Sequence, residues 1–263
     1  MVIAEKQTKD MLTASKIGRY AINPYVGCPH ACKYCYASFM KRFTNHPEPW
    51  GEFIDVKRCD RKIDLRKIAG KNVFMSTATD CYNPYEAKYG ITRSILEQLV
   101  GSDCHLQIST KNKLILRDMD LLKRMKRLSV AMSVNTLDEN FRRDMDKGST
   151  IRERLDTLRT FHDEGIYTIL FMSPIFVGIT DWQAIIEQSR NFISEYWFED
   201  LNLRGSYKPV IMRYVAEHYP HLYPTYERIY SKGDRTELIA NDRAICAYCD
   251  AENVNYSAYF HHE

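Results

Sequence analysis

The sequence predicts an α/β fold, a partial TIM-like (β/α)6 barrel with a helical and irregular C-terminal extension. Short apolar stretches typical of buried strands alternate regularly with amphipathic stretches at helical spacing. The connections are long enough for parallel pairing, which needs a crossover of about a dozen residues or more. With 263 residues, 44% of them apolar, the chain can form a barrel core. We expect an N-terminal arm over 1–18, the barrel over 19–205 and the extension over 206–263.

Six strands are expected in the barrel. The clearest runs from Ile166 to Ile175 and is nearly all apolar, as a strand buried on both faces should be. Amphipathic spacing and a stop at Gly165 predict a helix over 150–165, whereas the polar residues 41–60 are expected to form a long loop. The expected strands are 19–26, 72–77, 105–111, 129–135, 166–175 and 200–205, and the other expected helices follow Cys35 or cover 92–100, 116–128 and 180–196.

Charge and hydropathy limit the classes of function. A net charge of +3 gives no overall footprint of a nucleic-acid-binding protein. No apolar run approaches the ~18 residues of a membrane-spanning helix, and no secretory signal is recognised. Eight cysteines in a chain of this size fit metal-binding thiolates in a reducing compartment better than a disulfide scaffold. We therefore expect a cytoplasmic protein with no membrane partner.

Three cysteines with C-x3-C-x2-C spacing predict an iron–sulfur site. Cys28, Cys32 and Cys35 can each ligate one corner of a [4Fe–4S] cluster, which takes four thiolates when fully protein-bound. Three ligands leave one iron open to a substrate or cofactor, as in catalytic metal sites generally. A structural zinc site is the alternative, but zinc usually takes paired ligand sets, and only His30 lies nearby. We favour iron–sulfur over zinc, and zinc over a chance cluster of thiols.

The triplet followed by an aromatic residue resembles the signature of the radical S-adenosylmethionine (SAM) superfamily. The resemblance implies that the open iron binds the amino and carboxylate groups of SAM. It also implies that one electron from the cluster cleaves the sulfonium bond, giving a 5′-deoxyadenosyl radical that abstracts hydrogen from an unknown substrate. A reductant such as flavodoxin or ferredoxin is then expected as a partner.

Further stretches resemble the spore photoproduct lyase-like branch, whose best-known members repair DNA. The chain also looks like the radical SAM proteins called mobile pair protein B, which implies a second radical SAM protein encoded alongside as a partner. The resemblance spans residues 23–181, the predicted barrel without the extension. Its stretches are the cysteine motif, Ser76–Asp80, Pro84–Glu86, Ser109–Lys111, Ser133–Asn135, Arg154–Gly165 and Met172–Asp181.

The resemblance implies cofactor-binding roles for polar residues at the predicted strand ends, where barrel active sites lie. Tyr36 would contact SAM, Thr79 and Asp80 would meet its amino and methionyl groups, and Lys111, Ser133 and Arg154 would face its carboxylate or ribose. A carboxylate favours Lys or Arg as its partner. Each residue also has an ordinary alternative: turn capping, a solvated charge, or for Arg154 a surface pair with Glu153 or Asp156.

One departure from the lyase concerns its cysteine hydrogen donor, three residues before the matching aspartate. Thr77 occupies that position here, which counts against photoproduct repair, while Cys81 lies on the other side of Asp80. Cys81 is our candidate catalytic residue, a relocated hydrogen donor. The alternative is a small buried residue at a strand end.

A second cysteine pair, Cys246 and Cys249, provides half of a metal site. A second metal could be completed by Cys59, Cys104 or the terminal histidines His261 and His262, or across an interface. Thiols facing the core are the equal alternative.

Two other functions compete with the radical enzyme. A nucleic-acid-directed lyase or repair-like protein is suggested by the resemblance and by the basic run Lys123–Arg127, although such a run is usually a solvated helix face. A non-catalytic iron–sulfur protein would need a fourth cluster ligand and would not bind SAM.

Overall fold

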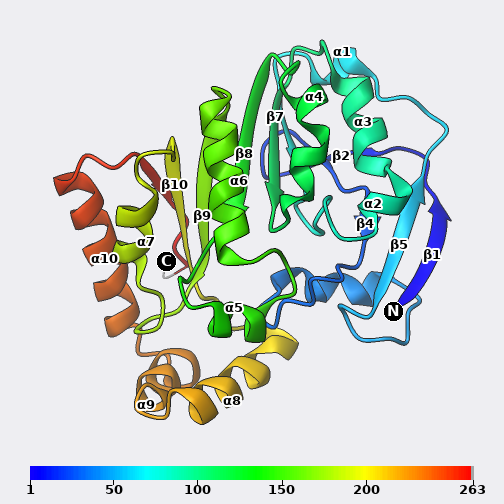
Figure 1. The fold of residues 1–263 in the computed structure, drawn as a ribbon. Helices are drawn as coiled ribbons and strands as arrows, with labels where there is room; N and C mark the ends of the chain where they lie inside the picture. The colour runs from blue at the N-terminus through cyan, green and yellow to red at the C-terminus, as the bar shows by residue number, and fades with distance from the viewer. Residues whose placement is uncertain (262–263) are drawn as a thin grey trace.

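An open eight-stranded sheet forms the centre of the computed structural model, which describes residues 1–261. Its strands are parallel except β2, which is antiparallel to β3. Figure 1 shows the strands as a curved, unclosed layer. The predicted α/β fold with a partial barrel is thus confirmed. The order is β11 (Tyr256–Ala258), β10 (Glu195–Asp200), β9 (Tyr167–Ile175), β8 (Arg127–Ser133), β7 (His105–Thr110), β6 (Asn72–Met75), β3 (Tyr20–Ile22) and β2 (Leu12–Ala14).

Helices cover the outer face of this sheet because alternate strand residues there are apolar. Leu106 and Val130 belong to one buried cluster, and Leu170 and Phe198 to another. The helices crossing between strands include α3 (Ile91–Leu99), η2 (Lys113–Asp118), α4 (Met119–Leu122), α6 (Ile151–Asp163) and α7 (Trp182–Ser189) (Figure 1). The others are η1 (Tyr36–Phe43), α1 (Leu65–Ile68), α2 (Glu86–Tyr89), α5 (Glu139–Met145), η3 (Gly205–Tyr207), α8 (Lys208–His218), α9 (Tyr223–Glu227), η4 (Arg228–Lys232) and α10 (Thr236–Ala251).

The N-terminal arm and the 41–60 loop each contain a strand that was not predicted. β1 (Val2–Gln7) pairs in parallel with β5 (Phe53–Arg58), and β4 (Tyr25–Val26) pairs with the other edge of β5. β1 is an edge strand with mostly exposed side chains, so it lacks an apolar pattern. The predicted strand 19–26 is divided between β3 and β4, because the chain leaves the large sheet at Asn23 and Pro24.

The sixth barrel strand was predicted too late in the chain. It is Glu195–Asp200 rather than 200–205, and the preceding helix ends at Ser189 instead of near Tyr196. Half-buried and buried residues alternate along this strand, the period of two expected of a strand. The predicted helix 116–128 was also too long, since α4 ends at Leu122 and β8 begins at Arg127.

The extension is helical at first, as predicted, but its end forms a strand of the barrel sheet where irregular structure was expected. β11 pairs in parallel with β10 and extends the sheet beyond the sixth strand. α10 precedes it, with Leu238, Ile245 and Cys249 buried on one side. Within the part of the chain that the structure describes, no helix is both long and apolar enough to cross a membrane.

The capping box of α6 gives a direct test of this fold. The Thr150 side chain accepts a hydrogen bond from the Glu153 amide at 3.2 Å, and Glu153 accepts one from the Thr150 amide at 2.9 Å. We expect Thr150→Ala to lower the free energy of unfolding by about 1 kcal/mol. The Glu153 amide loses its hydrogen-bond acceptor, and the reciprocal pair of the capping box is broken. Urea denaturation measures this change, and Thr160→Ala within the same helix is the control. Equal stability of the two variants would contradict a stabilising cap.

Candidate active site

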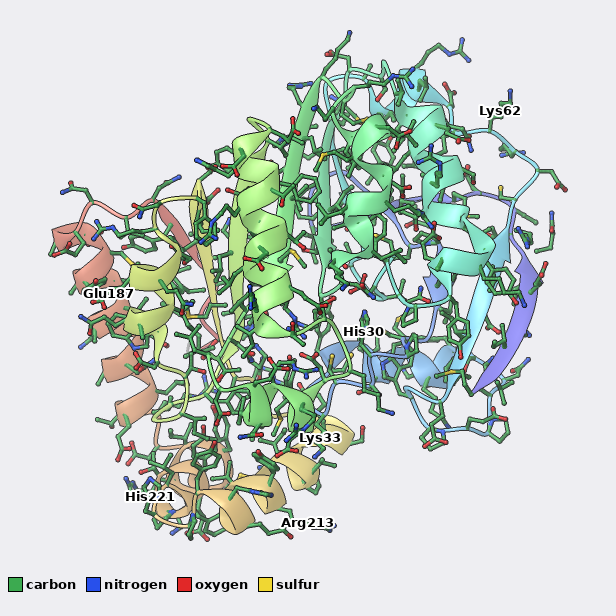
Figure 2. The ribbon with its side chains drawn as sticks, in the orientation of Figure 1. His30, Lys33, Lys62, Glu187, Arg213 and His221 are labelled. Atoms are coloured by element: carbon green, nitrogen blue, oxygen red, sulfur yellow. The ribbon has the colours of Figure 1, made fainter. Side chains whose placement is uncertain are left out.

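The loop that carries the cysteine triplet begins at a bend that requires glycine. Gly27 has φ +83°, and a Cβ there would lie 2.4 Å from the Phe53 carbonyl oxygen. The loop follows β4 and passes below the barrel sheet, where Figure 2 shows His30 and Lys33 beside α5. η1 starts directly after Cys35.

The end of β6 holds one side of this cysteine loop. The Thr79 hydroxyl donates to the Gly27 carbonyl at 2.6 Å. His30 Nε2 lies 3.1 Å from Asp80 Oδ2, and both side chains are buried. Asp80 also accepts hydrogen bonds from the Thr110 hydroxyl at 2.7 Å and the Lys111 amide at 2.8 Å. Burial raises the pKa of Asp80, but His30 and these donors outweigh it, so the pKa lies below its ordinary value.

The segment after α5 holds the other side of the loop. The Lys33 amide donates to the Met145 carbonyl at 2.9 Å, and the Lys147 amide donates to the His30 carbonyl at 2.8 Å. The Tyr34 hydroxyl donates to Asp146 Oδ2 at 3.2 Å. Two buried carboxylates, Asp80 and Asp146, therefore fix the cysteine loop from opposite sides.

The three thiols lie in an environment suited to a bound metal cluster. Burial, Asp80 and Cys35 raise the pKa of Cys28 to about 12. Burial and then Asp146 raise the pKa of Cys32, and burial raises that of Cys35. Such thiols stay protonated unless a positive centre stabilises the thiolates, which is what metal coordination does. The donor set thus fits a [4Fe–4S] group.

A single metal ion would need several ligands that converge on one point. Among residues 1–261, no group of three or more His, Cys, Asp or Glu is arranged to hold a single metal ion. A four-iron cluster spreads its thiolate ligands over separate irons and does not require such convergence.

Arg154 is buried rather than on the helix surface. Its guanidinium forms an ion pair with Asp146, and each side chain is 1% exposed. It also donates to the Ser149 carbonyl at 2.8 Å and the Ser133 carbonyl at 3.0 Å. The alternative partners do not hold it, since Glu153 pairs with Lys113. A SAM contact by Arg154 stays a prediction, and the structure adds a role in holding Asp146.

Lys111 and Ser133 lie at the ends of β7 and β8, as predicted. Lys111 Nζ is 5.6 Å from the centre of the Tyr34 ring, and its charge helps to lower the pKa of Cys32 against the effect of burial. Gly148 packs against this lysine, because a Cβ there would lie 2.9 Å from Lys111 Cβ. The proposed contacts of Lys111 and Ser133 with SAM stay predictions.

Tyr36 and Cys81 have contrasting surroundings. The side chain of Tyr36 is 55% exposed, and its hydroxyl donates to the Thr77 carbonyl beside β6. Cys81 is 0% exposed and lies in the apolar cluster under α3. Its burial supports the packing alternative over hydrogen donation.

The Cys246/Cys249 pair lies on α10, and within residues 1–261 no third His, Cys, Asp or Glu joins it in a group that could hold a metal ion. Cys249 is buried in an apolar cluster. Cys59 donates to the Arg61 carbonyl, Cys104 Sγ lies 3.3 Å from Ser102 Oγ, and His261 pairs with Glu199. His262 lies outside the described residues. The second metal stays a prediction.

Side chains of the basic run Lys123–Arg127 pair with a carboxylate and with a backbone carbonyl. Lys123 forms an ion pair with Glu164, and Arg127 donates to the Asp103 carbonyl at 2.7 Å. This arrangement supports a solvated surface over a nucleic-acid contact.

Sequence reasoning missed two residues that organise the site. His30 was considered only as a zinc ligand, and Asp146 was not considered. Their role depends on partners 50 and more residues distant, His30 with Asp80 and Asp146 with Tyr34, which no local motif reveals. The Asp-Lys-Gly sequence at 146–148 is an ordinary turn signal.

Comparison with known proteins agrees with this site. The family model described as "Radical SAM superfamily" matches residues 22–187. An uncharacterised protein of Methanocaldococcus jannaschii is 34% identical over 252 residues, which cover 94% of this chain and 90% of that protein. An uncharacterised protein of Mycobacterium tuberculosis is 28% identical over 232 residues, covering 82% of this chain and 68% of that protein.

Solved structures share the fold at low sequence identity. Spore photoproduct lyase complexed with dinucleoside spore photoproduct matches with a TM-score of 0.59 and 17% identity, over 83% of this chain and 66% of that chain. Streptococcus suis SuiB bound to S-adenosylmethionine matches with a TM-score of 0.57 and 14% identity, over 92% of this chain and 49% of that chain. The chain thus spans about two thirds of the lyase and half of SuiB. With the family model covering the cysteine loop and most of the barrel, this chain belongs to the radical SAM superfamily.

Proposed function

We propose that the chain is a radical SAM enzyme whose cluster ligands are Cys28, Cys32 and Cys35. The observation that carries the proposal is the position of these three half-buried thiols on one loop, held between Asp80 and Asp146 below the barrel sheet. When bound, the cluster would supply the electron that cleaves SAM to methionine and a 5′-deoxyadenosyl radical, which would abstract hydrogen from a substrate that the comparisons do not identify.

The surrounding residues prepare the loop for this chemistry. Asp80 and Asp146 fix its position through His30, Lys111 and Tyr34, so the cysteines need little rearrangement on metal binding. Lys111 supplies positive charge beside Cys32, where the SAM carboxylate is proposed to bind. The neighbours include spore photoproduct lyase, with a dinucleoside, and SuiB, with a precursor peptide. The proposed partners are a protein reductant and one substrate of unknown identity.

The test is release of 5′-deoxyadenosine from SAM. Protein reconstituted with iron and sulfide without oxygen is incubated with dithionite and SAM, and the products are measured by mass spectrometry. We expect 5′-deoxyadenosine and methionine in equal amounts, because both come from the same bond cleavage. A preparation with a full cluster that binds SAM but releases no 5′-deoxyadenosine would contradict the proposal. A fourth protein ligand seen by spectroscopy would instead favour the non-catalytic alternative.

A further inference from the structure

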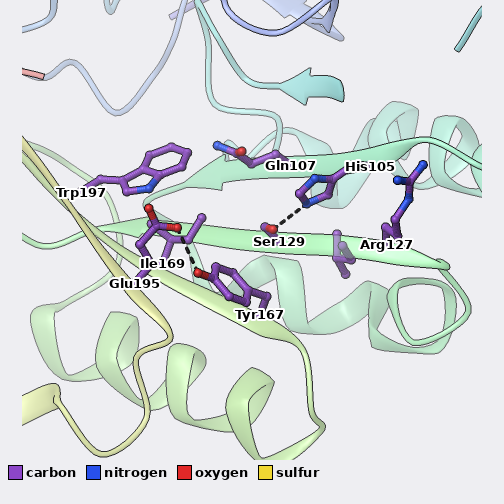
Figure 3. Close-up of a pocket in the computed structure, with 9 residues that line it drawn as sticks. His105, Gln107, Arg127, Ser129, Tyr167, Ile169, Glu195 and Trp197 are labelled. Carbon is purple, nitrogen blue, oxygen red and sulfur yellow. Dashed lines mark hydrogen bonds between the residues drawn. The ribbon is translucent and has the colours of Figure 1, made fainter. Parts of the chain in front are cut away.

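The inner face of the barrel sheet carries polar and aromatic side chains instead of an apolar core. Alternate residues of β9 and β10 point to this side, among them Ile169, Trp197 and Glu199, while their neighbours belong to the outer apolar cluster. A cavity of about 430 Å³ opens on this inner face. Figure 3 shows its walls formed by β7, β8, β9 and β10. The lining residues are His105, Gln107, Arg127, Leu128, Ser129, Tyr167, Ile169, Glu195 and Trp197.

Two hydrogen-bond donors in this cavity have no partner. Gln107 is 8% exposed, and its Nε2 is buried without a hydrogen bond, as is Nε1 of Trp197. Figure 3 shows the amide and the indole on the same side of the sheet. A buried donor without a partner destabilises the protein. A ligand with carbonyl oxygens would remove that destabilisation at both positions.

One carboxylate, Glu195, and one guanidinium, Arg127, line the cavity. Glu195 accepts hydrogen bonds from the Tyr167 hydroxyl at 3.1 Å and the Ser257 hydroxyl at 2.7 Å. Glu199 lies two residues further along β10, accepts from Ser173 and pairs with His261. Arg127 pairs with Asp103 at the rim, where it donates to the carbonyl at 2.7 Å and lies 3.9 Å from the carboxylate. Burial and Arg127 lower the pKa of His105, which favours the neutral imidazole. Because Arg127 is already paired, a phosphate would meet the Glu195 carboxylate, whereas amide N–H and ammonium groups can donate to that carboxylate.

We propose that this cavity binds a peptide segment of the substrate, an inference that rests on the proposed radical SAM function. Peptide carbonyls accept hydrogen bonds from Gln107 and Trp197, and amide or lysine N–H groups donate to Glu195 and Glu199. The cavity lies near the starts of the strands, whereas the cysteine loop lies at their ends. From Ile169 to Ser173 the strand rises about 13 Å. An extended segment of about four residues therefore reaches from the cavity to the strand ends.

Nuclear magnetic resonance of the tryptophan indoles tests this binding. The chain has three tryptophans, so the full-length protein with its cluster gives three indole N–H signals, and Trp197→Phe identifies one of them. The probes are acetyl-Gly-Lys-Gly-amide, which carries carbonyls and an ammonium, and the dinucleotide TpT, which carries base carbonyls and a phosphate. We expect the peptide to move the Trp197 signal downfield, while TpT leaves it unchanged.

A matched pair of variants separates the cavity from general effects. Gln107→Leu should weaken peptide binding about tenfold, because one hydrogen bond is lost. Gln188→Leu makes the same change at an exposed position of α7 and should bind as wild type does. A response to TpT in place of the peptide, or no response to either probe by protein with three dispersed indole signals, would overturn the inference. Absence of 5′-deoxyadenosine from the same preparation would contradict the proposed function instead.

Discussion

The Cys32→Ala variant is expected to lose most of its iron and to release at least about a hundredfold less 5′-deoxyadenosine than wild type. Mutation of groups that only support metal ligands already costs about 10–100-fold, and Cys32 is predicted to be a ligand itself. The half-buried thiol lies beside Asp146 and Lys111, and an alanine methyl group cannot ligate iron in its place. Iron per chain is measured by a colorimetric assay, and the nucleoside is measured by chromatography after anaerobic reaction with dithionite.

Cys59→Ala is the matched control for this substitution. Cys59 is a free, partly exposed thiol after β5 that donates a hydrogen bond to the nearby Arg61 carbonyl. Its replacement is expected to leave iron content and SAM cleavage as in wild type. If Cys32→Ala kept wild-type iron and activity, the assignment of the triplet as cluster ligands would be wrong. If Cys59→Ala lost both, general thiol damage would explain the result.

The barrel was predictable where each strand has its own local signal. Ile166–Ile175 is almost continuously apolar, and the helix before it has a capping box and a terminal glycine. The apolar pattern and the residues at the helix ends therefore predict the same boundaries. The cysteine motif was predictable because its spacing is fixed within eight residues. The sequence was less informative at the edges of the sheet. β1 and β11 are short or exposed edge strands held by pairing with β5 and β10, and pairing with a distant segment leaves no local pattern.

The geometry around the cysteine loop was less predictable for the same reason. Arg154 is in an amphipathic helix whose neighbours suggested a surface ion pair, yet it points to a buried aspartate. Asp80 is predicted to contact SAM, which stays a prediction, and its carboxylate also accepts hydrogen bonds from the Thr110 hydroxyl and the Lys111 amide at the end of β7. Both residues were singled out from the sequence, Asp80 after a strand and Arg154 within a helix. The hydrogen-bond and ion-pair partners of these residues depend on how the cysteine loop, 28–35, packs against the segments around Asp80 and Asp146. Tertiary packing decides that arrangement.

Arg154→Met is expected to lower the free energy of unfolding by about 3–5 kcal/mol, because it leaves the Asp146 carboxylate buried without its cation. Both side chains are 1% exposed, so water does not screen the pair. Asp146 would keep the Gly148 amide and the Tyr34 hydroxyl as donors, which do not neutralise its charge. Urea denaturation of the protein prepared without cluster or SAM measures the change.

The choice of that preparation separates two roles for Arg154. If its guanidinium acted only on the carboxylate or ribose of SAM, removing it would not change stability in the absence of SAM. A large loss there indicates that Arg154 fixes Asp146, and through Tyr34 the cysteine loop, before any cofactor binds. Arg152→Met is the control, because Arg152 is 91% exposed and pairs with Asp156 at 3.6 Å on the same helix. That pair is worth at most about 0.5 kcal/mol.

Because a buried ion pair can often be replaced by apolar residues without loss of stability, the double variant Arg154→Met/Asp146→Leu should be more stable than Arg154→Met alone.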